Sequence, residues 1–241
     1  MNSSQHFFNV IGIPTWFYKM DEYYLTEQNI SSKADEWLAN LSMRPSRLKQ
    51  FKFLPKNSAL FVIDMQKFFL DEKSHAFIPS AITIVQNINS IITEYRNHNY
   101  PIIFTFHALE EGEEPGIMGR WWGDMLRDTD PLSKIHPSIN HKKNDITLQK
   151  KRYSAFIGTN LDQILKDKKI DTVVIVGIMT HLCCESTARE AFMRDYEVYF
   201  VVDATATDFE ELHVSSLKTL NDGFVLPVKT SNILEGVKQF A

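Results

Sequence analysis

The chain has 241 residues, a net charge of −4 and an apolar fraction of 44%. This length suits one α/β domain with at most a small appendage, and the composition argues against a disordered chain. No basic block stands out, so we expect no nucleic-acid partner. No apolar run reaches the roughly 18 residues of a membrane span, and the first residues do not resemble a signal peptide. We therefore expect a cytoplasmic protein with no membrane partner.

Cysteine and histidine usage gives no sign of a metal or a disulfide framework. The two cysteines, Cys183 and Cys184, are adjacent, which makes a disulfide framework implausible and a zinc site poor. The candidate ligands His107, His181 and His213 are scattered, without a pair at metal-binding spacing. We predict no metal and no cofactor.

Residues 1–57 differ from the rest of the chain because they are rich in aromatic side chains. These include Trp16, Phe17, Tyr18, Tyr23, Tyr24 and Trp37. Residues 31–41 have apolar side chains at helical spacing, which predicts a helix. We interpret residues 1–57 as an arm that packs on the main domain or on a partner subunit, and residues 58–241 as the main domain.

From residue 58 onward, apolar strands alternate with amphipathic helices. Strands are predicted at 59–63, 101–106, 146–148, 172–176, 198–202 and 224–228, and helices at 79–96, 161–169, 180–195 and 209–220. This alternation predicts an α/β fold with a doubly wound, six-stranded, mainly parallel sheet and helices on both faces, a three-layer sandwich.

Polar side chains follow several of the predicted strands. Asp64, His107 and Asp203 each end a strand, and residues 177–183 follow the fourth one. Ligands of such sheets bind at the carboxyl ends of the strands, so we expect these groups to converge there.

Cys183 is the candidate nucleophile, because we expect it at the start of a helix. Backbone amides at a helix N-terminus lower the pKa of a thiol and can later bind an oxyanion. The alternative is a small buried apolar side chain, which is our interpretation of Cys184.

Asp64 and Lys150 also have two interpretations each. A carboxylate after a buried strand either caps a helix or transfers protons. The basic cluster of Lys150, Lys151 and Arg152 is either a solvated surface turn or the source of a cation that holds a carboxylate and a thiolate in place.

Three stretches resemble the isochorismatase-like cysteine hydrolase superfamily. They are residues 60–69 (LFVIDMQKFF), residues 150–156 (KKRYSAF) and residues 177–195, which open with GIMTHLCC and close with AFMRD. The resemblance covers about residues 58–232 and identifies residues 58–241 as a hydrolase domain.

The resemblance implies a catalytic triad of Asp64, Lys150 and Cys183, with Lys151 as the alternative lysine. It also implies a cis peptide at Ile178–Met179 that directs the amides of Met179 and Cys183 toward an oxyanion. In the implied mechanism Asp64 takes the thiol proton, Cys183 attacks a carbonyl, and water releases the acid from a thioester.

Two branches of the superfamily remain open, together with a non-catalytic member of the fold. Residues 107–111 lack the metal pattern of nicotinamidases, which disfavours zinc and nicotinamide. Isochorismatases resemble this chain at His181 and at residues 191–195, but they have glycine in the place of Cys183 and protonate a vinyl ether with the aspartate. Cys183 favours hydrolysis of an amide or ureide C–N bond.

We predict that Gln66, His107, Trp121, Trp122 and His181 bind the small-molecule substrate. Residues 110–123 are expected to form a loop over the site, where the two tryptophans line a pocket or a subunit interface. The resemblance and the aromatic arm suggest a homodimer or a larger homo-oligomer.

Overall fold

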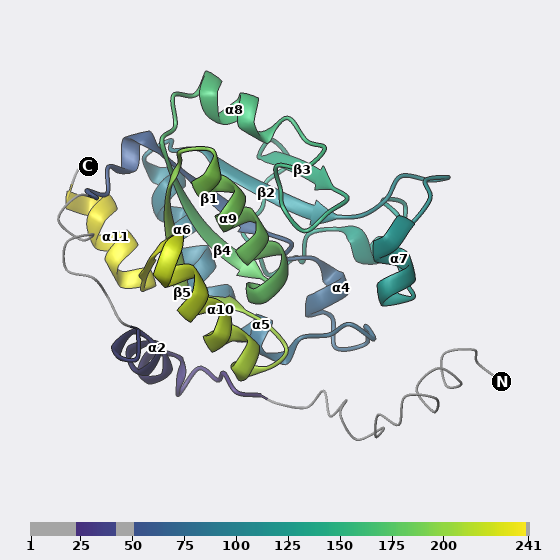
Figure 1. Cartoon of the computed structure of the whole chain (residues 1–241), viewed down its shortest axis with the longest axis horizontal. Helices are drawn as coiled ribbons and strands as arrows, with labels where there is room; N and C mark the ends of the chain where they lie inside the picture. The colour runs from purple at the N-terminus through teal and green to yellow at the C-terminus, as the bar shows by residue number, and fades with distance from the viewer. Residues whose placement is uncertain (1–22, 42–50, 240–241) are drawn as a thin grey trace.

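The computed structural model describes residues 23–41 and 51–239, and within them the chain forms one six-stranded sheet (Figure 1). The strands are β1 (Ser58–Ile63), β2 (Ile102–His107), β3 (Ile146–Lys150), β4 (Thr172–Ile178), β5 (Glu197–Ala206) and β6 (Leu226–Val228). Their order is β3-β2-β1-β4-β5-β6, and every neighbouring pair is parallel. The predicted doubly wound α/β sheet is confirmed.

Helices cover both faces of the sheet. They are α2 (Ile30–Ala39), α4 (Lys67–Leu70), α5 (Pro79–Thr83), α6 (Val85–Asn97), α7 (Gly116–Trp122), α8 (Leu161–Asp167), α9 (Glu185–Met193), α10 (Glu210–Gly223) and α11 (Thr230–Gln239), with short helical turns η2 (Pro55–Asn57), η3 (Pro131–Ser133) and η4 (Thr180–Cys184). Figure 1 shows α9 and α10 in front of the sheet, α6 behind it and α8 at the top of the view. Helix α6 packs on β1, β2 and β5, whereas α9 packs on β5 and α10.

The two central strands explain why the sheet forms. Every residue of β1 and of β4 is buried, and each of these strands pairs on both sides. Continuous apolar sequence is the pattern of parallel strands covered by helices on both faces. At the edge, β3 is only partly buried until its last residue, Lys150.

Gly177 allows β4 to approach the end of β1 closely. Its φ is +118°, and a Cβ atom there would lie 2.1 Å from the carbonyl oxygen of Ile63, its partner across the sheet. Only glycine avoids this overlap. Asp64, the residue after Ile63, has a left-handed backbone with a φ of +51°, which is uncommon for a residue with a side chain. The two strand ends are therefore held close together in a specific conformation.

The predicted helix 79–96 is two helices, α5 and α6, separated at Ile84. Ile84 is fully buried, whereas Ile82, which the single-helix pattern placed on the core face, is 43% exposed. The break rotates the apolar face of α5 relative to that of α6, so one continuous period did not describe both segments.

Strand β5 is longer than predicted and carries an irregularity. Ile175 pairs with Phe200, but Gly177 pairs with Thr205, so β5 has additional residues between these two pairs. Asp203 lies in this stretch, and its Oδ1 accepts hydrogen bonds from the amide and the hydroxyl of Thr230, at the start of α11. The expectation that Asp203 joins the site is therefore wrong, because its carboxylate caps a helix.

The described part of the N-terminal region lies on the main domain. Tyr24, Leu25, Ala34 and Trp37 are buried in the same hydrophobic core as the strands, and α2 packs on β5. Trp16, Phe17 and Tyr18 lie outside the described residues.

Three of the described helices were not predicted: α4, shortly after β1, α7, in the expected loop 110–123, and α11, near the C-terminus. Among the described residues, none of the helices has the length and the hydropathy that a membrane span requires.

Candidate active site

Three segments bring Asp64, Lys150 and Cys183 together at the carboxyl ends of the strands. Asp64 follows β1, Lys150 is the last residue of β3, and Cys183 lies in η4, the π-helical turn after β4. Lys150 pairs across the sheet with His107, the last residue of β2. This is the edge of the sheet at which ligands of doubly wound folds bind.

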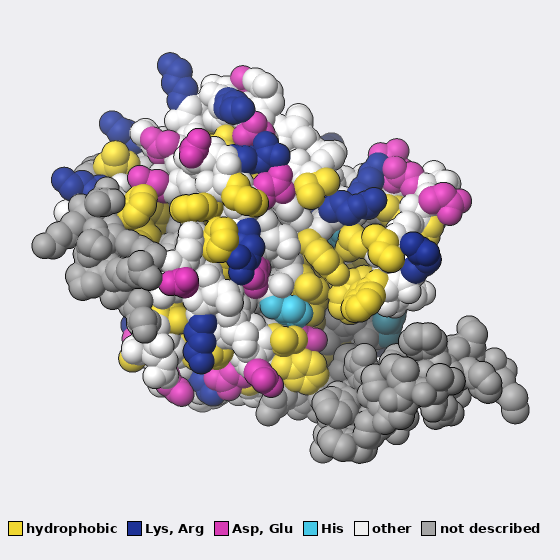
Figure 2. Space-filling model, viewed as in Figure 1, with side chains coloured by type: hydrophobic (Ala, Val, Ile, Leu, Met, Phe, Trp, Pro, Cys, Tyr) yellow, Lys and Arg dark blue, Asp and Glu magenta, His cyan; other side chains and the backbone are white. Residues whose placement is uncertain are grey.

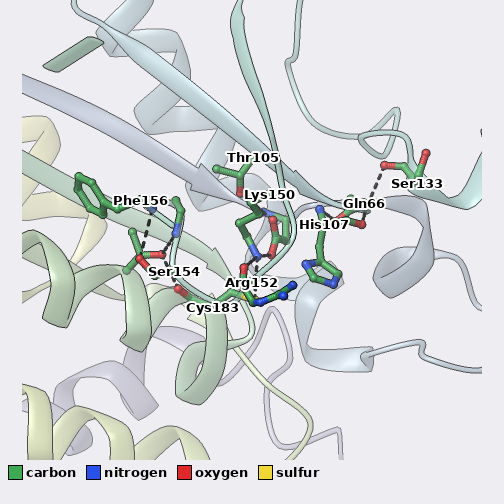
Figure 3. Close-up of polar contacts among 12 residues, drawn as sticks. Gln66, Thr105, His107, Ser133, Lys150, Arg152, Ser154, Phe156 and Cys183 are labelled. Atoms are coloured by element: carbon green, nitrogen blue, oxygen red, sulfur yellow. Dashed lines mark hydrogen bonds and ion pairs between the residues drawn. The ribbon is translucent and has the colours of Figure 1, made fainter. Parts of the chain in front are cut away.

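The ammonium group of Lys150 is the centre of the cluster (Figure 3). Its Nζ lies 2.7 Å from Oδ2 of Asp64 and 3.2 Å from Sγ of Cys183, and it donates to the carbonyl oxygen of Arg152 at 3.1 Å. The ammonium group is thus engaged by two hydrogen bonds and one ion pair. Lys150 and Asp64 are fully buried and Cys183 is 8% exposed, so Cys183 is the member of the cluster that retains some solvent-accessible surface.

Asp64 is fixed by the neighbouring strand β2. The hydroxyl of Thr105 donates to Oδ1 of Asp64 at 2.7 Å and accepts the amide hydrogen of Asp64 at 3.2 Å. Because Oδ1 is bound by Thr105 and Oδ2 faces Lys150, the carboxylate has one defined orientation.

Burial raises the pKa of the Cys183 thiol to about 12; the nearby Lys150 ammonium opposes this rise and the Asp64 carboxylate adds to it. The expectation of a lowered thiol pKa is therefore wrong for this state, because loss of solvent and a neighbouring carboxylate outweigh the cation. For Lys150, burial acts to lower the pKa, but the charge of Asp64 and the interaction with Cys183 outweigh it and the net pKa is raised. At neutral pH the cluster is an ammonium beside a protonated thiol.

The backbone around Cys183 is held by α9 and by the turn itself. The hydroxyl of Thr187 donates to the carbonyl of Cys183 at 2.7 Å and accepts the amide of Ala155 at 3.0 Å. It therefore links the nucleophile candidate to the segment that follows Lys150. The carbonyl of Met179 accepts the amides of Leu182 and Cys184, so these two amides are already bonded.

The peptide bond between Ile178 and Met179 is cis. We expected Cys183 at the first turn of an α-helix. It lies instead in the π-helical turn that precedes α9. Cys184 is fully buried, in keeping with a core residue.

Gln66 has a different place from the one predicted. It is fully buried, its Nε2 donates to the carbonyls of His107 and Ser133, and its Oε1 accepts the amide of His107. Its amide group is thus engaged with backbone and positions the end of β2 (Figure 3). The prediction that Gln66 binds substrate directly is not supported.

His107 lies beside the cluster. Burial and the charge of Lys150 together lower the pKa of His107 to about 4, against the opposite effect of Asp64, so the imidazole is neutral at pH 7. Its Nδ1 is buried and has no hydrogen-bond partner among the described residues. Buried polar atoms are normally bonded, so this nitrogen is a candidate for contact with a ligand.

His181 belongs to the same turn as Cys183, and its Nδ1 lies 2.8 Å from the hydroxyl of Thr207. On α7, Trp121 is 76% exposed and Trp122 is 50% exposed, with its indole N–H donating to the hydroxyl of Tyr153. Hydrophobic side chains gather beside α7 on the face shown in Figure 2. In the described part of the chain, neither tryptophan forms a hydrogen bond with Asp64, Lys150 or Cys183.

The remaining predicted groups lie apart from the cluster. Lys151, the alternative to Lys150, forms exposed ion pairs with Glu110 and Glu113.

A hollow of about 740 Å³ between α6 and α11 includes Asn89 and Leu234, but no member of the triad lines it. Within residues 23–41 and 51–239, no three His, Cys, Asp or Glu side chains are grouped so that they could hold a metal ion.

Thr105 and Thr187 were not predicted from the sequence. A threonine within a buried strand is a weak signal, because threonine is common in strands. Thr187 lies four residues after Cys183, a spacing at which its hydroxyl reaches the preceding turn of a helix, and this signal was available.

Comparison with known proteins agrees with the fold. The isochorismatase domain family matches residues 58–232. Nicotinamidase 3 of Arabidopsis thaliana is 38% identical over 70% of this chain and 83% of the relative. Enterobactin synthase component B of Escherichia coli (strain K12) is 30% identical over 72% of this chain, which spans 61% of that relative.

The solved structure of a cysteine hydrolase from Pseudomonas syringae pv. phaseolicola 1448A superposes with a TM-score of 0.75. It is 25% identical, and the match covers 79% of this chain and 97% of the other. The family match spans the strands and turns that build the Asp64–Lys150–Cys183 cluster, and the chain is a hydrolase of the isochorismatase domain family.

Proposed function

We propose that the protein is a cysteine hydrolase that cleaves the C–N bond of a small amide or ureide through a thioester on Cys183. One observation carries the proposal: a buried ammonium, that of Lys150, contacts both the Asp64 carboxylate and the Cys183 sulfur. Purely structural buried ion pairs do not require a thiol as a third member. This arrangement offers a nucleophile, a base and a counter-ion within hydrogen-bond distance.

In the first step, the thiol proton of Cys183 passes to Asp64 as sulfur attacks the substrate carbonyl. A raised thiol pKa is compatible with this order, because the proton leaves during attack rather than beforehand. Lys150 stabilises the negative charge that develops on sulfur. The tetrahedral intermediate then collapses, the C–N bond breaks, and Asp64 returns the proton to the departing amine.

In the second step, Asp64 takes a proton from water, which attacks the thioester carbonyl. The C–S bond breaks, the acid leaves, and Cys183 regains its proton. We assign oxyanion stabilisation in both steps to the amides of Met179 and Cys183. The amides of Leu182 and Cys184 are excluded because both already donate to the carbonyl of Met179.

Substrate contacts are assigned to His107, His181, Trp121 and Trp122. The unbonded Nδ1 of His107 can accept or donate one hydrogen bond, and α7 supplies apolar surface at the same sheet edge. Similarity to a nicotinamidase keeps nicotinamide among the substrates to test, although the metal pattern of that branch is absent at residues 107–111. We further propose a homodimer or larger assembly, with residues 1–57 as an arm.

The test measures ammonia release from a panel of small amides and ureides that includes nicotinamide, with wild type and Cys183→Ala. The proposal expects release by wild type and loss of at least about a thousandfold in the variant, as for removal of a nucleophile. Isochorismate is a parallel substrate. Pyruvate release that survives Cys183→Ala would instead establish vinyl-ether hydrolysis with Asp64 as the acid.

A further inference from the structure

Residues 23–41 contact side chains that support η4, the turn that bears Cys183. This segment lies outside the family match, which begins at residue 58. Two of its aromatic side chains, Tyr24 and Trp37, are almost fully buried and contact groups that hold η4. Each contact begins a short chain of interactions that ends within the turn bearing Cys183.

The first chain runs from Trp37 through His213 to Thr180. The rings of Trp37 and His213 have centroids 4.4 Å apart, and Nδ1 of His213 lies 2.9 Å from the hydroxyl of Thr180. All three side chains are buried. Burial, with a smaller contribution from His181, lowers the pKa of His213 to about 3, so this imidazole is neutral and holds one proton to share. Trp37 therefore holds the ring of His213 in place, and His213 in turn holds Thr180, the first residue of η4.

The second chain runs from Tyr24 through Thr207 to His181. The backbone amide of Thr207 donates to the hydroxyl of Tyr24 at 3.1 Å, and the Thr207 hydroxyl lies 2.8 Å from Nδ1 of His181. The same hydroxyl donates its only proton to the carboxylate of Asp208. Burial lowers the pKa of His181, which favours the neutral ring. In that ring Nδ1 must donate to Thr207, which leaves Nε2 as an acceptor.

The segment is anchored independently of the turn. Glu210, at the start of α10, accepts from the indole N–H of Trp37 at 2.9 Å and forms an ion pair with Lys33 at 2.7 Å. The hydroxyl of Thr83 donates to the carbonyl of Leu25. These contacts hold Trp37 and Tyr24 against their partners.

We propose that residues 23–41 are a positioning element of the hydrolase, in which Trp37 and Tyr24 set the geometry of the turn Thr180–Cys184. The inference rests on the proposed function only in that this turn bears the nucleophile. Neither residue touches the reacting atoms. Both act through the residues at the start of the turn, where a displacement of about 1 Å can cost a hundredfold in rate.

The test compares Tyr24→Phe and Trp37→Phe with a control on the same helix. Tyr24→Phe keeps the ring and removes the hydroxyl, which accepts the Thr207 amide and also interacts with Ser80. Trp37→Phe keeps a ring on His213 and loses the bond to Glu210. Asp35→Asn is the control, because it alters an exposed pair of α2 with Lys229. We expect kcat to fall about tenfold in Tyr24→Phe with little change in KM, and Asp35→Asn to match wild type.

Trp37→Leu removes the ring altogether and is expected to lower kcat further than Trp37→Phe does. This graded loss separates support of His213 from a general loss of stability. If Trp37→Leu does not fold, Tyr24→Phe still decides the question, since it deletes one oxygen atom. A lowered unfolding midpoint with unchanged kcat in both phenylalanine variants would overturn the proposal.

Two measurements need no substrate and so separate this inference from the proposed function. The first is the rate at which iodoacetamide alkylates Cys183, followed by mass spectrometry, which should change at least threefold in Tyr24→Phe and not in Asp35→Asn. The second is the nitrogen NMR spectrum of His181, which should show a protonated Nδ1 in wild type and a mixture of tautomers in Tyr24→Phe. An unchanged alkylation rate together with an unchanged tautomer would contradict the inference even if amide hydrolysis is established.

Discussion

Replacing Lys150 by methionine should destabilise the fold strongly, because it leaves a buried carboxylate without its cation. Methionine keeps an unbranched side chain of similar length and removes the charge. Nζ of Lys150 and Oδ2 of Asp64 are 2.7 Å apart, and both side chains have at most 1% exposure. After the substitution, no solvent could therefore take the place of the Lys150 ammonium beside Asp64.

The size of the effect follows from this geometry. At an effective dielectric constant of about 20, two unit charges at this distance attract by about 6 kcal/mol. The cost of desolvating both ions offsets part of this attraction, and removing one member of such a pair costs about 3–5 kcal/mol. A domain is stable by about 5–15 kcal/mol, so Lys150→Met should remain measurable but close to unfolding.

Urea unfolding followed by circular dichroism measures the free energy, with Asp64→Asn and the double variant completing a cycle. The double variant removes both charges, so it should lose at least about 2 kcal/mol less than the sum of the two single losses. Additivity within about 0.5 kcal/mol would refute the reasoning, since it would mean that the two groups do not depend on each other.

Three further predictions concern the scaffold of the site. Gly177→Ala should destabilise the fold by about 3 kcal/mol, since the new methyl group overlaps the Ile63 carbonyl at a positive φ; an unchanged urea midpoint would contradict this. Thr187→Val should cost about 2 kcal/mol, because the Cys183 carbonyl loses its donor, and a shift in unfolding free energy below about 0.5 kcal/mol would argue against that role. His213 has a folded pKa of about 3 against its usual 6.5, so the unfolded chain binds the extra proton and stability falls as pH falls through this range. His213→Asn should reduce that slope by up to about 1.4 kcal/mol per pH unit, and equal slopes from pH 6.5 to 4 would exclude the assignment.

The sheet and the position of the cluster were predictable because they depend on local sequence patterns. Continuous apolar runs identified the central strands, and the polar residues after them identified one edge of the sheet. The choice of Lys150 over Lys151 rested instead on the resemblance to the isochorismatase-like superfamily. In the structure Lys150 ends β3, whereas Lys151 lies just beyond that strand.

Other features could not be predicted from local patterns, because they depend on packing between segments that are distant in the sequence. The hydrogen bonds of Thr105 and the contact of Trp37 with His213 join residues that no local period relates. The thiol pKa was predicted in the wrong direction, because proximity to amides was considered and burial beside a carboxylate was not. Helix α11 was missed although Ile233 and Val237 have helical spacing and are buried, so there the signal existed.

The most direct test of the account is to trap the acyl intermediate on Cys183. Wild-type protein is mixed with an amide or ureide that it hydrolyses, quenched in acid within milliseconds, and measured as intact protein and as peptides by mass spectrometry. The account predicts a mass increase equal to the acyl group of the substrate, located on Cys183 and not on Cys184, and absent in Cys183→Ala. Turnover with no adduct on Cys183, and with activity retained in Cys183→Ala, would contradict it.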